Sequence, residues 1–358
     1  MYRDSYLKID LDKMARNCRF FQNLSDKKVM GVVKADGYGT IDYMEADLLR
    51  ELGVDFFAVS SLDEAMRLRK RGFNEKILIL GYVPEEALDI VRTNDISIVT
   101  VSLDYIRETD LRNVRLHLKL NTGMNRLGII PEEAEEALKI MLEKGAIVEG
   151  VMSHFSSADS DFDYSQKQYE RFRSCVLQLN HPFSYIHMSA TDGSLIINDD
   201  ICNYHRIGLG LLGYSSYHNE LEPCLSLHSK VSMLKQLKAG DTVSYGRHYV
   251  SDGSGYVLTI PIGYADGFYR SNTGKQVYVD GQYGTIIGSV CMDQLMILCQ
   301  QPHPVGTEVE LFGEHISIEE RARQLNTITY ELLTGMSDRL SRIYLKDGKI
   351  IKTIDPRF

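Results

Sequence analysis

The sequence contains no long hydrophobic run. None of its apolar stretches approaches the roughly 18 residues that a membrane-spanning helix needs. Its first residues, Met1 to Asp4, do not resemble the apolar core of a signal peptide. The six cysteines are scattered and form no CxxC pair, which is typical of reduced thiols. We therefore expect a cytoplasmic protein with no membrane partner.

Metal-binding patterns and an excess of positive charge are also missing. The ten histidines show no HxH or HxxxH spacing, so we expect no metal site. Forty basic against 49 acidic residues give a net charge of -9, which argues against a nucleic-acid partner. The chain has 358 residues, 44% of them hydrophobic and 25% charged, which fits a globular protein with two domains or one large barrel.

Residues 28 to 214 alternate between short β-rich runs and stretches with helical periodicity. The eight expected strands are Lys28–Lys34, Phe56–Leu62, Lys76–Tyr82, Ser97–Ser102, Arg115–Asn121, Ile147–Phe155, Phe183–Ala190 and Arg206–Tyr214. The expected helices are Asp42–Leu52, Asp63–Arg71, Pro84–Thr93, Leu103–Asp110, Pro131–Lys144, Ser165–Leu179 and a short one near Ser194–Asp199. This α/β alternation favours a (β/α)8 TIM-type barrel over an open doubly wound sheet. No GxGxxG motif follows the first strand to support the open sheet.

From about Leu225 the helical periodicity gives way to short alternating runs separated by glycine turns. The expected strands are Ser229–Leu237, Gly255–Ile260, Lys275–Val279, Thr285–Ser289, Leu295–Leu298 and Glu308–Phe312, with one helix at Ile318–Gln324. This pattern of short strands and glycine turns predicts a second, mostly antiparallel β domain. We assign residues 10–224 to the barrel and 225–358 to the β domain, which residues 1–9 join.

Lys34 ends the first expected strand, within the stretch Val32-Val33-Lys34-Ala35-Asp36-Gly37-Tyr38-Gly39. In a barrel of this kind the carboxyl ends of the strands face the active site. Loss of solvation there lowers the pKa of a lysine and makes its amine a usable nucleophile or base. The alternative is a lysine whose amine reaches solvent at the end of the strand.

Further polar residues fall at the same predicted end of the barrel. Each has a structural explanation when taken alone: His154 could be a buried core histidine, and Arg126 could cap a helix or pair with an acid. Together, cations and small hydroxyls beside a reactive lysine suit a bound phosphate and a carboxylate. The set consists of Lys34, Tyr38, Asn121, Arg126, His154, Ser189, Thr191, Arg206 and Gly208.

Several motifs resemble those of the alanine racemases, in order and spacing and over both predicted domains. They are Val33-Lys34-Ala35-Asp36-Gly37-Tyr38-Gly39, Lys119-Leu120-Asn121-Thr122-Gly123-Met124-Asn125-Arg126-Leu127-Gly128, Ser153-His154-Phe155, Pro261-Ile262-Gly263-Tyr264-Ala265-Asp266-Gly267 and Cys291-Met292-Asp293-Gln294. The resemblance implies a barrel followed by a β domain. It also implies a racemase that interconverts L- and D-alanine and supplies D-amino acid for peptidoglycan.

The resemblance implies the following roles. Lys34 would bind pyridoxal 5'-phosphate (PLP) and act as one catalytic base. Tyr264 of the partner subunit would be the other base, in a homodimer with shared active sites. Two bases are needed because racemisation removes a proton from one face of the α-carbon and returns one to the other.

The same resemblance implies the binding residues. Arg206 would contact the pyridine nitrogen, without giving up its own proton, and His154 would support Arg206 or stack near the ring. The phosphate would be bound by Tyr38, Ser189, Thr191 and the backbone amides of Gly208 and Leu209. The substrate carboxylate would be bound by Arg126 and by the backbone amide of Met292, also from the partner subunit. Lys119 occupies the position of a lysine that is carbamylated in some members.

The sequence departs from the family pattern at four places. Thr40 stands where a histidine is common, Ile207 replaces a proline, and the Thr191-Asp192-Gly193 turn is unusual. Asp338 replaces a tyrosine that lines the substrate pocket near the phosphate. A carboxylate beside a phosphate is repelled, so we expect Asp338 to turn towards Arg339, Arg342 or the substrate. The freed volume suits a hydroxymethyl group, which makes serine an alternative or additional substrate.

Two other functions fit the barrel less well. A PLP-dependent amino-acid decarboxylase would carry a glycine-rich phosphate loop and a carboxylate at the ring nitrogen, and the sequence offers neither. A non-enzymatic PLP-binding protein would not need the β domain with Tyr264 and Met292.

Overall fold

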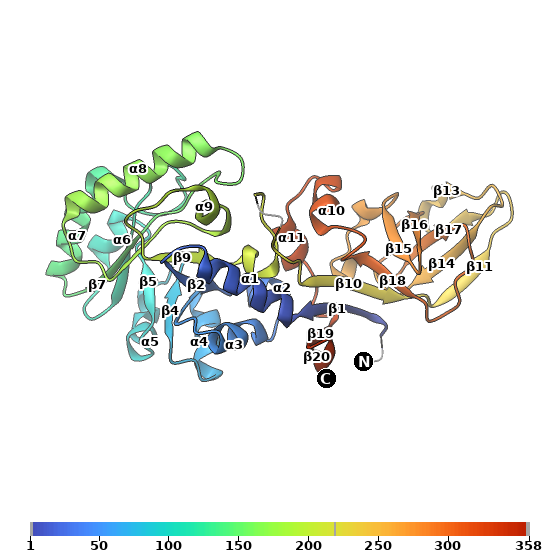
Figure 1. Cartoon of the computed structure of the whole chain (residues 1–358), viewed down its shortest axis with the longest axis horizontal. Helices are drawn as coiled ribbons and strands as arrows, with labels where there is room; N and C mark the ends of the chain where they lie inside the picture. The colour runs from blue at the N-terminus through green and yellow to red at the C-terminus, as the bar shows by residue number, and fades with distance from the viewer. Residues whose placement is uncertain (1–2, 218–219, 356–358) are drawn as a thin grey trace. The chain divides into compact units, whose positions relative to one another are not determined.

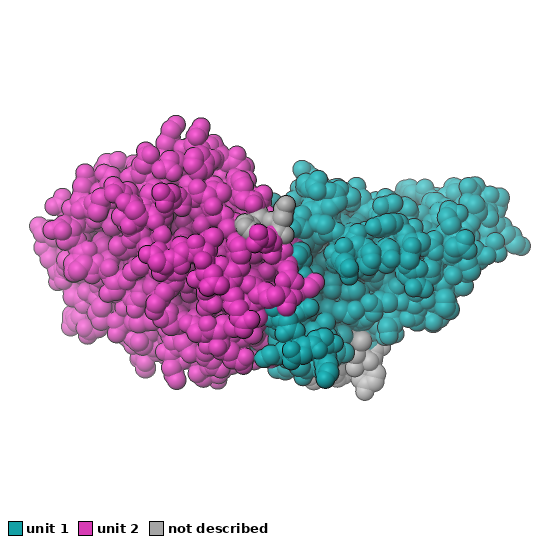
Figure 2. Space-filling view, in the orientation of Figure 1, with its two compact units in different colours: residues 1–12, 38–42, 223–358 teal, residues 13–37, 43–222 magenta. Residues whose placement is uncertain are grey.

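The computed structural model describes residues 3–217 and 220–355. Residues 1–2 and 356–358 of the expected β domain, and residues 218–219 of the expected barrel, lie outside this description. The chain divides into two compact units, residues 13–37 with 43–222 and residues 1–12 with 38–42 and 223–358 (Figure 2). Each unit is built around its own sheet.

The first unit contains a closed barrel of eight parallel strands between Lys28 and Ile207, a stretch that is described throughout (Figure 1). Around the barrel the strands are β2 (Lys28–Val32), β3 (Phe56–Val59), β4 (Lys76–Ile79), β5 (Ser97–Val99), β6 (Arg115–Lys119), β7 (Ile147–Met152), β8 (Tyr185–His187) and β9 (Tyr204–Ile207). The last strand closes the barrel because Met30 of β2 pairs with Arg206 of β9. The predicted α/β barrel is confirmed.

Helices connect successive strands of the barrel, as the periodicity predicted. They are α3 (Met44–Glu51), α4 (Leu62–Lys70), α5 (Leu88–Thr93), α6 (Leu103–Glu108), α7 (Ala134–Glu143), α8 (Phe162–Leu179) and α9 (Thr191–Ile196). Their amphipathic pattern explains this arrangement: in α4, for example, Ala65 and Leu68 are fully buried while charged neighbours face outwards. Helix α1 (Leu11–Asn23) precedes the barrel and was not predicted.

The predicted eighth strand, Arg206–Tyr214, was placed wrongly. The strand begins at Tyr204 and ends at Ile207, so Arg206 lies near its carboxyl end rather than at its start. The following residues, Leu209–Leu212, form a short 3-10 helix that ends at Gly213, where φ is 91°. The apolar residues after Ile207 could belong either to a strand or to a helical turn, and a short apolar run does not distinguish the two. The strand was therefore predicted to be too long.

The second unit contains a ten-stranded sheet among its described residues. In spatial order its strands are β11 (Met233–Gln236), β14 (Tyr256–Ile260), β17 (Leu295–Cys299), β16 (Gln282–Ile287), β15 (Gln276–Val279), β18 (Glu308–Phe312), β10 (Leu225–Lys230), β1 (Ser5–Asp10), β19 (Ser341–Lys346) and β20 (Lys349–Ile354). Its pairs are antiparallel except for β1 with β19, which confirms a mostly antiparallel domain.

The sequence missed several elements of this sheet domain. The expected strand Ser229–Leu237 is two strands, because β10 pairs with β18 and β11 pairs with β14. Strands β19 and β20 were not predicted, nor was α11 (Thr329–Thr334), which follows the expected helix α10 (Ile318–Gln324). The described helices include none that is long and apolar enough to cross a membrane.

Arg342 anchors β19 inside the second unit. Its side chain is fully buried, and its guanidinium donates to the backbone carbonyl oxygens of Gly39, Met336, Ser337 and Leu340 at 2.7–3.1 Å. Burial lowers the pKa of Arg342 to about 10, so it stays charged at neutral pH. The charge is stabilised by four carbonyl dipoles in place of a carboxylate.

We expect Arg342→Met to lower the free energy of unfolding by about 3 kcal/mol, because it leaves several buried carbonyl groups without a donor. Urea titration followed by circular dichroism measures the change. Arg323→Met is the matched control, because that side chain is 76% exposed and pairs with Glu320 on the helix surface. Equal losses in the two variants would contradict a structural role for the carbonyl contacts.

Candidate functional site

Lys34 opens a left-handed turn at the end of the first barrel strand. The backbone φ angles of Ala35, Asp36, Gly37, Tyr38 and Gly39 are all positive, between 50° and 91°. This conformation costs roughly 1–2 kcal/mol for each residue with a side chain. Such strain gathers at functional sites and needs support from its surroundings. Gly37 and Gly39 thus belong to a left-handed segment of five residues within α2 (Lys34–Gly39).

Glu64 of α4 supports this turn. One of its carboxylate oxygens accepts from the backbone N–H of Ala35 at 2.7 Å, and the other accepts from the backbone N–H and hydroxyl of Ser60 at 2.7 and 2.9 Å. Asp36 pairs with Arg67 and accepts from the Tyr43 hydroxyl at 3.1 Å. The turn is therefore fixed to the first helices of the barrel.

The carboxyl end of the barrel is rich in positive charge. Burial, and then the charge of Arg126, lower the pKa of Lys34, while Glu64 opposes the change. Burial and the charges of Arg206, Arg126 and Lys34 lower the pKa of Lys119 to about 7. A substantial fraction of the Lys119 amine is therefore neutral near physiological pH. The lowered pKa of Lys34 favours its neutral amine, which is the form that reacts or accepts a proton.

The guanidinium of Arg206 is buried among hydrogen-bond acceptors. It donates to Nδ1 of His187 and Nδ1 of His154, both at 2.8 Å, and to the carbonyl oxygens of Ser153 and Met188 at 3.0 and 2.7 Å. Burial lowers the pKa of Arg206 to about 10, so the group remains a cation. The structure thus brings His154 against Arg206.

Both histidines beside Arg206 are neutral. Burial and the charge of Arg206 hold the pKa values of His154 and His187 well below the ordinary histidine value. Because arginine has no acceptor, each Nδ1 must be the unprotonated nitrogen. Neither histidine adds to the positive charge.

Ser189, Thr191 and the 208–210 backbone follow β8 and β9 at the carboxyl end of the barrel. The hydroxyl of Ser189 is buried and has no hydrogen-bond partner. The hydroxyl of Thr191 accepts from the backbone N–H of Gly210 at 3.0 Å. A Cβ at Gly210 would lie 2.6 Å from the ring of Phe21, so only glycine fits there. Leu209 is buried beside it.

The remaining expected residues, Tyr38, Tyr264, Met292 and Asp338, belong to the second unit. There the ring of Tyr38 lies 6.1 Å from that of Tyr330. Tyr264 and Met292 lie side by side, because the backbone N–H groups of Tyr264 and Ala265 donate to the carbonyl oxygens of Cys291 and Met292 at 3.0 Å. Both side chains are exposed, Tyr264 to 39% and Met292 to 53%.

Asp266 fixes the turn that presents Tyr264. Its carboxylate is fully buried, accepts from the backbone N–H of Gly263 at 2.9 Å and binds Arg3 through two hydrogen bonds of 2.5 and 2.6 Å. Nε of Arg339 lies 3.4 Å from the same carboxylate, and its Nη2 binds Asp293 at 2.5 Å. One buried carboxylate therefore connects the segments that carry Tyr264, Met292 and Asp338.

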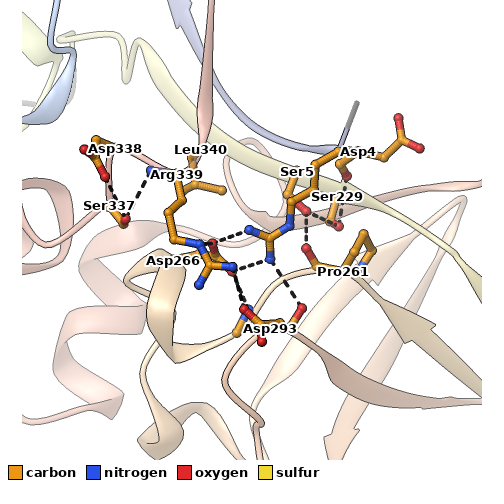
Figure 3. Close-up of polar contacts among 12 residues, drawn as sticks. Asp4, Ser5, Ser229, Pro261, Asp266, Asp293, Ser337, Asp338, Arg339 and Leu340 are labelled. Carbon is orange, nitrogen blue, oxygen red and sulfur yellow. Dashed lines mark hydrogen bonds and ion pairs between the residues drawn. The ribbon is translucent and has the colours of Figure 1, made fainter. Parts of the chain in front are cut away.

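Asp338 itself is exposed and accepts a 3.4 Å hydrogen bond from the hydroxyl of Ser337. The expected pairing with Arg339 is wrong, because Arg339 points to Asp266 and Asp293 (Figure 3). Arg342 is bonded to backbone carbonyls, although the charge of Asp338 contributes to its pKa. The carboxylate of Asp338 is thus left facing solvent.

Two residues that support the site were missed from the sequence: His187, which accepts from Arg206, and Asp266, which supports the turn that presents Tyr264. His187 could have been found from the strand period, because side chains two apart in a strand share a face and His187 therefore shares a face with Ser189. Asp266 gave no such signal, since only the fold shows that its carboxylate is buried.

Comparison with known proteins decides the family. A model of the alanine racemase N-terminal domain matches residues 9–216, and a model of the C-terminal domain matches residues 224–344. The chain belongs to the alanine racemase family. It is therefore an isomerase of the alanine racemase type.

Similar proteins and solved structures support this family assignment over nearly the whole chain. Alanine racemase of Staphylococcus epidermidis is 37% identical over 368 residues, covering 97% of this chain and 96% of that protein. The crystal structure of alanine racemase from Bacillus anthracis, with bound L-Ala-P, superposes with a TM-score of 0.90 at 32% identity, covering 99% of this chain and 98% of that chain. A histidine racemase from Leuconostoc mesenteroides has a TM-score of 0.87 at 28% identity, covering 96% and 99%.

In the cofactor-free protein we expect the pKa of the Lys34 amine to be lower than that of an exposed lysine. Arg126→Met should raise the pKa of Lys34, because a neighbouring positive charge is removed. Reductive methylation with carbon-13 formaldehyde followed by NMR over a pH series measures both values. Lys139, 74% exposed, is the internal reference and should not respond to the Arg126 variant. A Lys34 pKa equal to that of Lys139 would contradict the desolvated site.

Proposed function

We propose that the chain racemises alanine with PLP bound at Lys34, and that Lys34 and Tyr264 are the two bases. The observation that supports this most is the buried Lys34, whose pKa is lowered, at a barrel end that also carries Arg206 with its two neutral histidines. The alanine racemase relatives and the L-Ala-P complex of the Bacillus anthracis protein support alanine as substrate.

The residues present fit PLP. The barrel end carries the cations Lys34, Lys119, Arg126 and Arg206, with Glu64 as the acid that offsets Lys34. Such a surplus suits an anionic phosphate and a substrate carboxylate. The unpartnered Ser189 hydroxyl offers a donor to a phosphate oxygen, beside the backbone of Gly208 and Leu209. Thr191 would hold that backbone through Gly210, and Tyr38 would add a phenolic donor.

PLP, when bound, supplies the electron sink that acidifies the α-proton of an amino acid. Arg206 would donate a hydrogen bond to the ring nitrogen and would keep its own proton, because its pKa stays near 10. Arg126 and the Met292 amide bind the substrate carboxylate and so fix which faces of the α-carbon the bases meet. The Lys34 amine, whose pKa burial lowers, would take the proton on one face, and the Tyr264 hydroxyl would return one on the other.

The active unit of this proposal is a homodimer in which Tyr264 and Met292 serve the partner subunit. Their exposure and their fixed position beside one another support this, since a group that completes another subunit's site must stand free on its own. Lys119, with a pKa of about 7, is suited to carbamylation, which requires a neutral amine. A cytoplasmic role in supplying D-alanine for peptidoglycan completes the proposal.

Mixing two inactive variants tests both the bases and the shared site. Lys34→Ala and Tyr264→Phe should each abolish racemisation in both directions. After subunit exchange about a quarter of parental activity should return, because half of the dimers are mixed and each mixed dimer has one intact site of two. Each variant exchanged with itself is the control, and mass spectrometry verifies the exchange. Verified mixed dimers without activity would rule out the shared site.

Asp338 favours serine as a second substrate. The carboxylate is exposed and not paired with Arg339, so it is available as an acceptor for a substrate hydroxyl. The histidine racemase of Leuconostoc mesenteroides has the same fold, which supports variation of the side-chain pocket on this scaffold. A site that hydrogen-bonds a substrate hydroxyl discriminates against the analogue that lacks it.

Asp338→Tyr should lower the ratio of kcat/KM for serine to that for alanine about tenfold, the value of one hydrogen bond of about 1.4 kcal/mol. Chiral chromatography of initial rates with both amino acids measures the ratio. Asp338→Asn is the control, since the amide keeps an acceptor oxygen of similar reach. If the tyrosine variant keeps the parental ratio, Asp338 plays no part in specificity.

A further inference from the structure

The residues at the start of β1 lie next to the segment that carries Tyr264. The hydroxyl of Ser5 donates to the backbone carbonyl oxygen of Pro261 at 2.8 Å (Figure 3). The carbonyl oxygen of Asp4 accepts from the backbone N–H of Lys230 at 3.0 Å, which continues the pairing of β1 with β10. The backbone at the start of β1 is therefore fixed against both β10 and the Tyr264 segment.

Arg3 binds a buried carboxylate in that segment with a fork of two hydrogen bonds. Its Nη1 and Nη2 donate to Oδ1 and Oδ2 of Asp266 at 2.5 and 2.6 Å, and Nη2 also donates to the carbonyl oxygen of Asp293 at 3.3 Å. Paired bonds between a guanidinium and a carboxylate are strong and fix direction as well as distance. One guanidinium thus contacts both the turn of Tyr264 and the residue that follows Met292.

The carboxylate of Asp266 closes the turn that presents Tyr264. The residues Tyr264–Asp266 form a single 3-10 turn, and Oδ2 of Asp266 accepts from the backbone N–H of Gly263 at the start of that turn, at 2.9 Å. The Asp266 side chain has no solvent exposure. A buried carboxylate without a cation is unfavourable and would turn towards water, away from the Gly263 N–H. Closure of the turn therefore depends on the cation beside it.

Arg339 does not take the place of Arg3 at this carboxylate. Nε of Arg339 lies 3.4 Å from Oδ1 of Asp266, whereas its Nη2 donates to Oδ1 of Asp293 at 2.5 Å (Figure 3). The side chain of Asp293 is 53% exposed, so the shorter contact of Arg339 is made to a carboxylate that water also reaches. Arg3 is therefore the main partner of the buried charge.

The position of the turn matters because the Tyr264 ring receives limited support from its own unit. The residue is 39% exposed, so packing covers only part of it. A group that moves a proton must come within hydrogen-bond reach of it, and a displacement of 1 Å can cost a factor of about 100 in rate. The backbone of the turn, and hence Asp266 with Arg3, determines where the Tyr264 hydroxyl lies.

We propose that Arg3 is a positioning residue for Tyr264 and acts through Asp266. It keeps the carboxylate of Asp266 turned inwards, which keeps the turn closed and the Tyr264 hydroxyl in one place. The proposal rests on the proposed function only in taking Tyr264 as a base. The link from Arg3 to the turn is independent of any reaction.

Hydrogen–deuterium exchange of the purified full chain, followed by mass spectrometry, tests the link between Arg3 and the turn. In Arg3→Gln the amides of residues 263–266 should exchange about tenfold faster, because the turn opens more often. Arg16→Gln is the matched control and should leave these amides unchanged, since Arg16 binds both carboxylate oxygens of Glu222, at 2.5 and 2.8 Å, in the other unit. Unchanged exchange in Arg3→Gln would overturn the proposal.

Racemisation by the holoenzyme tests whether the turn positions a base. Arg3→Gln should lower kcat about tenfold. With α-deuterated alanine, the isotope effect should rise for one enantiomer relative to the other, because Tyr264 removes the proton from only one of them. A loss of folded protein alone would slow both directions equally and leave the ratio of the two isotope effects unchanged. A parental ratio in Arg3→Gln would overturn the proposal.

Asp266→Asn shows whether Arg3 acts through this carboxylate. The amide is neutral and keeps an oxygen that accepts from Gly263, so in this background Arg3→Gln should slow racemisation less than about twofold further. Losses that multiply would place the action of Arg3 elsewhere and overturn the proposal. If Asp266→Asn does not fold, the exchange and isotope measurements decide the matter.

Tyr264→Phe separates a failure of this proposal from a failure of the proposed function. Parental racemisation in Tyr264→Phe would refute the proposed base, and the exchange experiment would still judge the link from Arg3 to the turn. An inactive Tyr264→Phe together with a parental isotope ratio in Arg3→Gln would refute the positioning role alone. An inactive Tyr264→Phe with a changed ratio and faster exchange in Arg3→Gln is the expected result.

Discussion

The buried arginine at the carboxyl end of the barrel can donate hydrogen bonds but cannot accept them. Arg206 is 3% exposed and must therefore find acceptors inside the protein for its N–H groups. It finds two backbone carbonyls and the Nδ1 atoms of His154 and His187. Both histidines must consequently be neutral, and their tautomers are fixed.

The same charge sets the chemistry of the amines nearby. Together with burial and Arg126 it lowers the pKa values of Lys34 and Lys119, that of Lys119 to about 7, which favours the neutral amines without a neighbouring base. A barrel end with a surplus of cations is costly in isolation. It becomes stable when anionic ligands bind, which is the electrostatic reason for expecting a phosphate and a carboxylate there.

The second unit uses a buried ion of opposite sign for a similar purpose. Asp266 accepts from a backbone N–H of the turn that presents Tyr264 and binds Arg3, and Arg339 approaches it. Removal of either arginine would leave the buried carboxylate undercompensated, and the turn would lose its support. In the second unit, then, a group proposed to meet the substrate is held in place by a buried charge, whereas in the first unit the buried charge of Arg206 acts on the pKa values of nearby amines.

The sequence by itself determined the class of fold and much of the candidate site. Alternating strand and helix periods predicted the barrel, and the position of Lys34 at a strand end predicted its lowered pKa, because both depend on local pattern. The order of the motifs predicted the alanine racemase family. The ends of the elements, the position of the eighth strand and the strands β19 and β20 could not be predicted from the sequence. A short apolar run can form a strand or a helical turn, and only the neighbouring strands decide which.

Only the tertiary structure decided how polar side chains pair across strands. Arg206, His187 and His117 come from β9, β8 and β6, and nothing in the chain order indicates that they meet. The sequence likewise did not predict that Arg339 pairs with Asp266 and Asp293 and not with Asp338, because residue spacing does not give the direction of a side chain. The local sequence pattern determines which face of a strand or helix a residue lies on. The pairing of strands in the barrel and in the sheet then determines which other side chains that residue contacts.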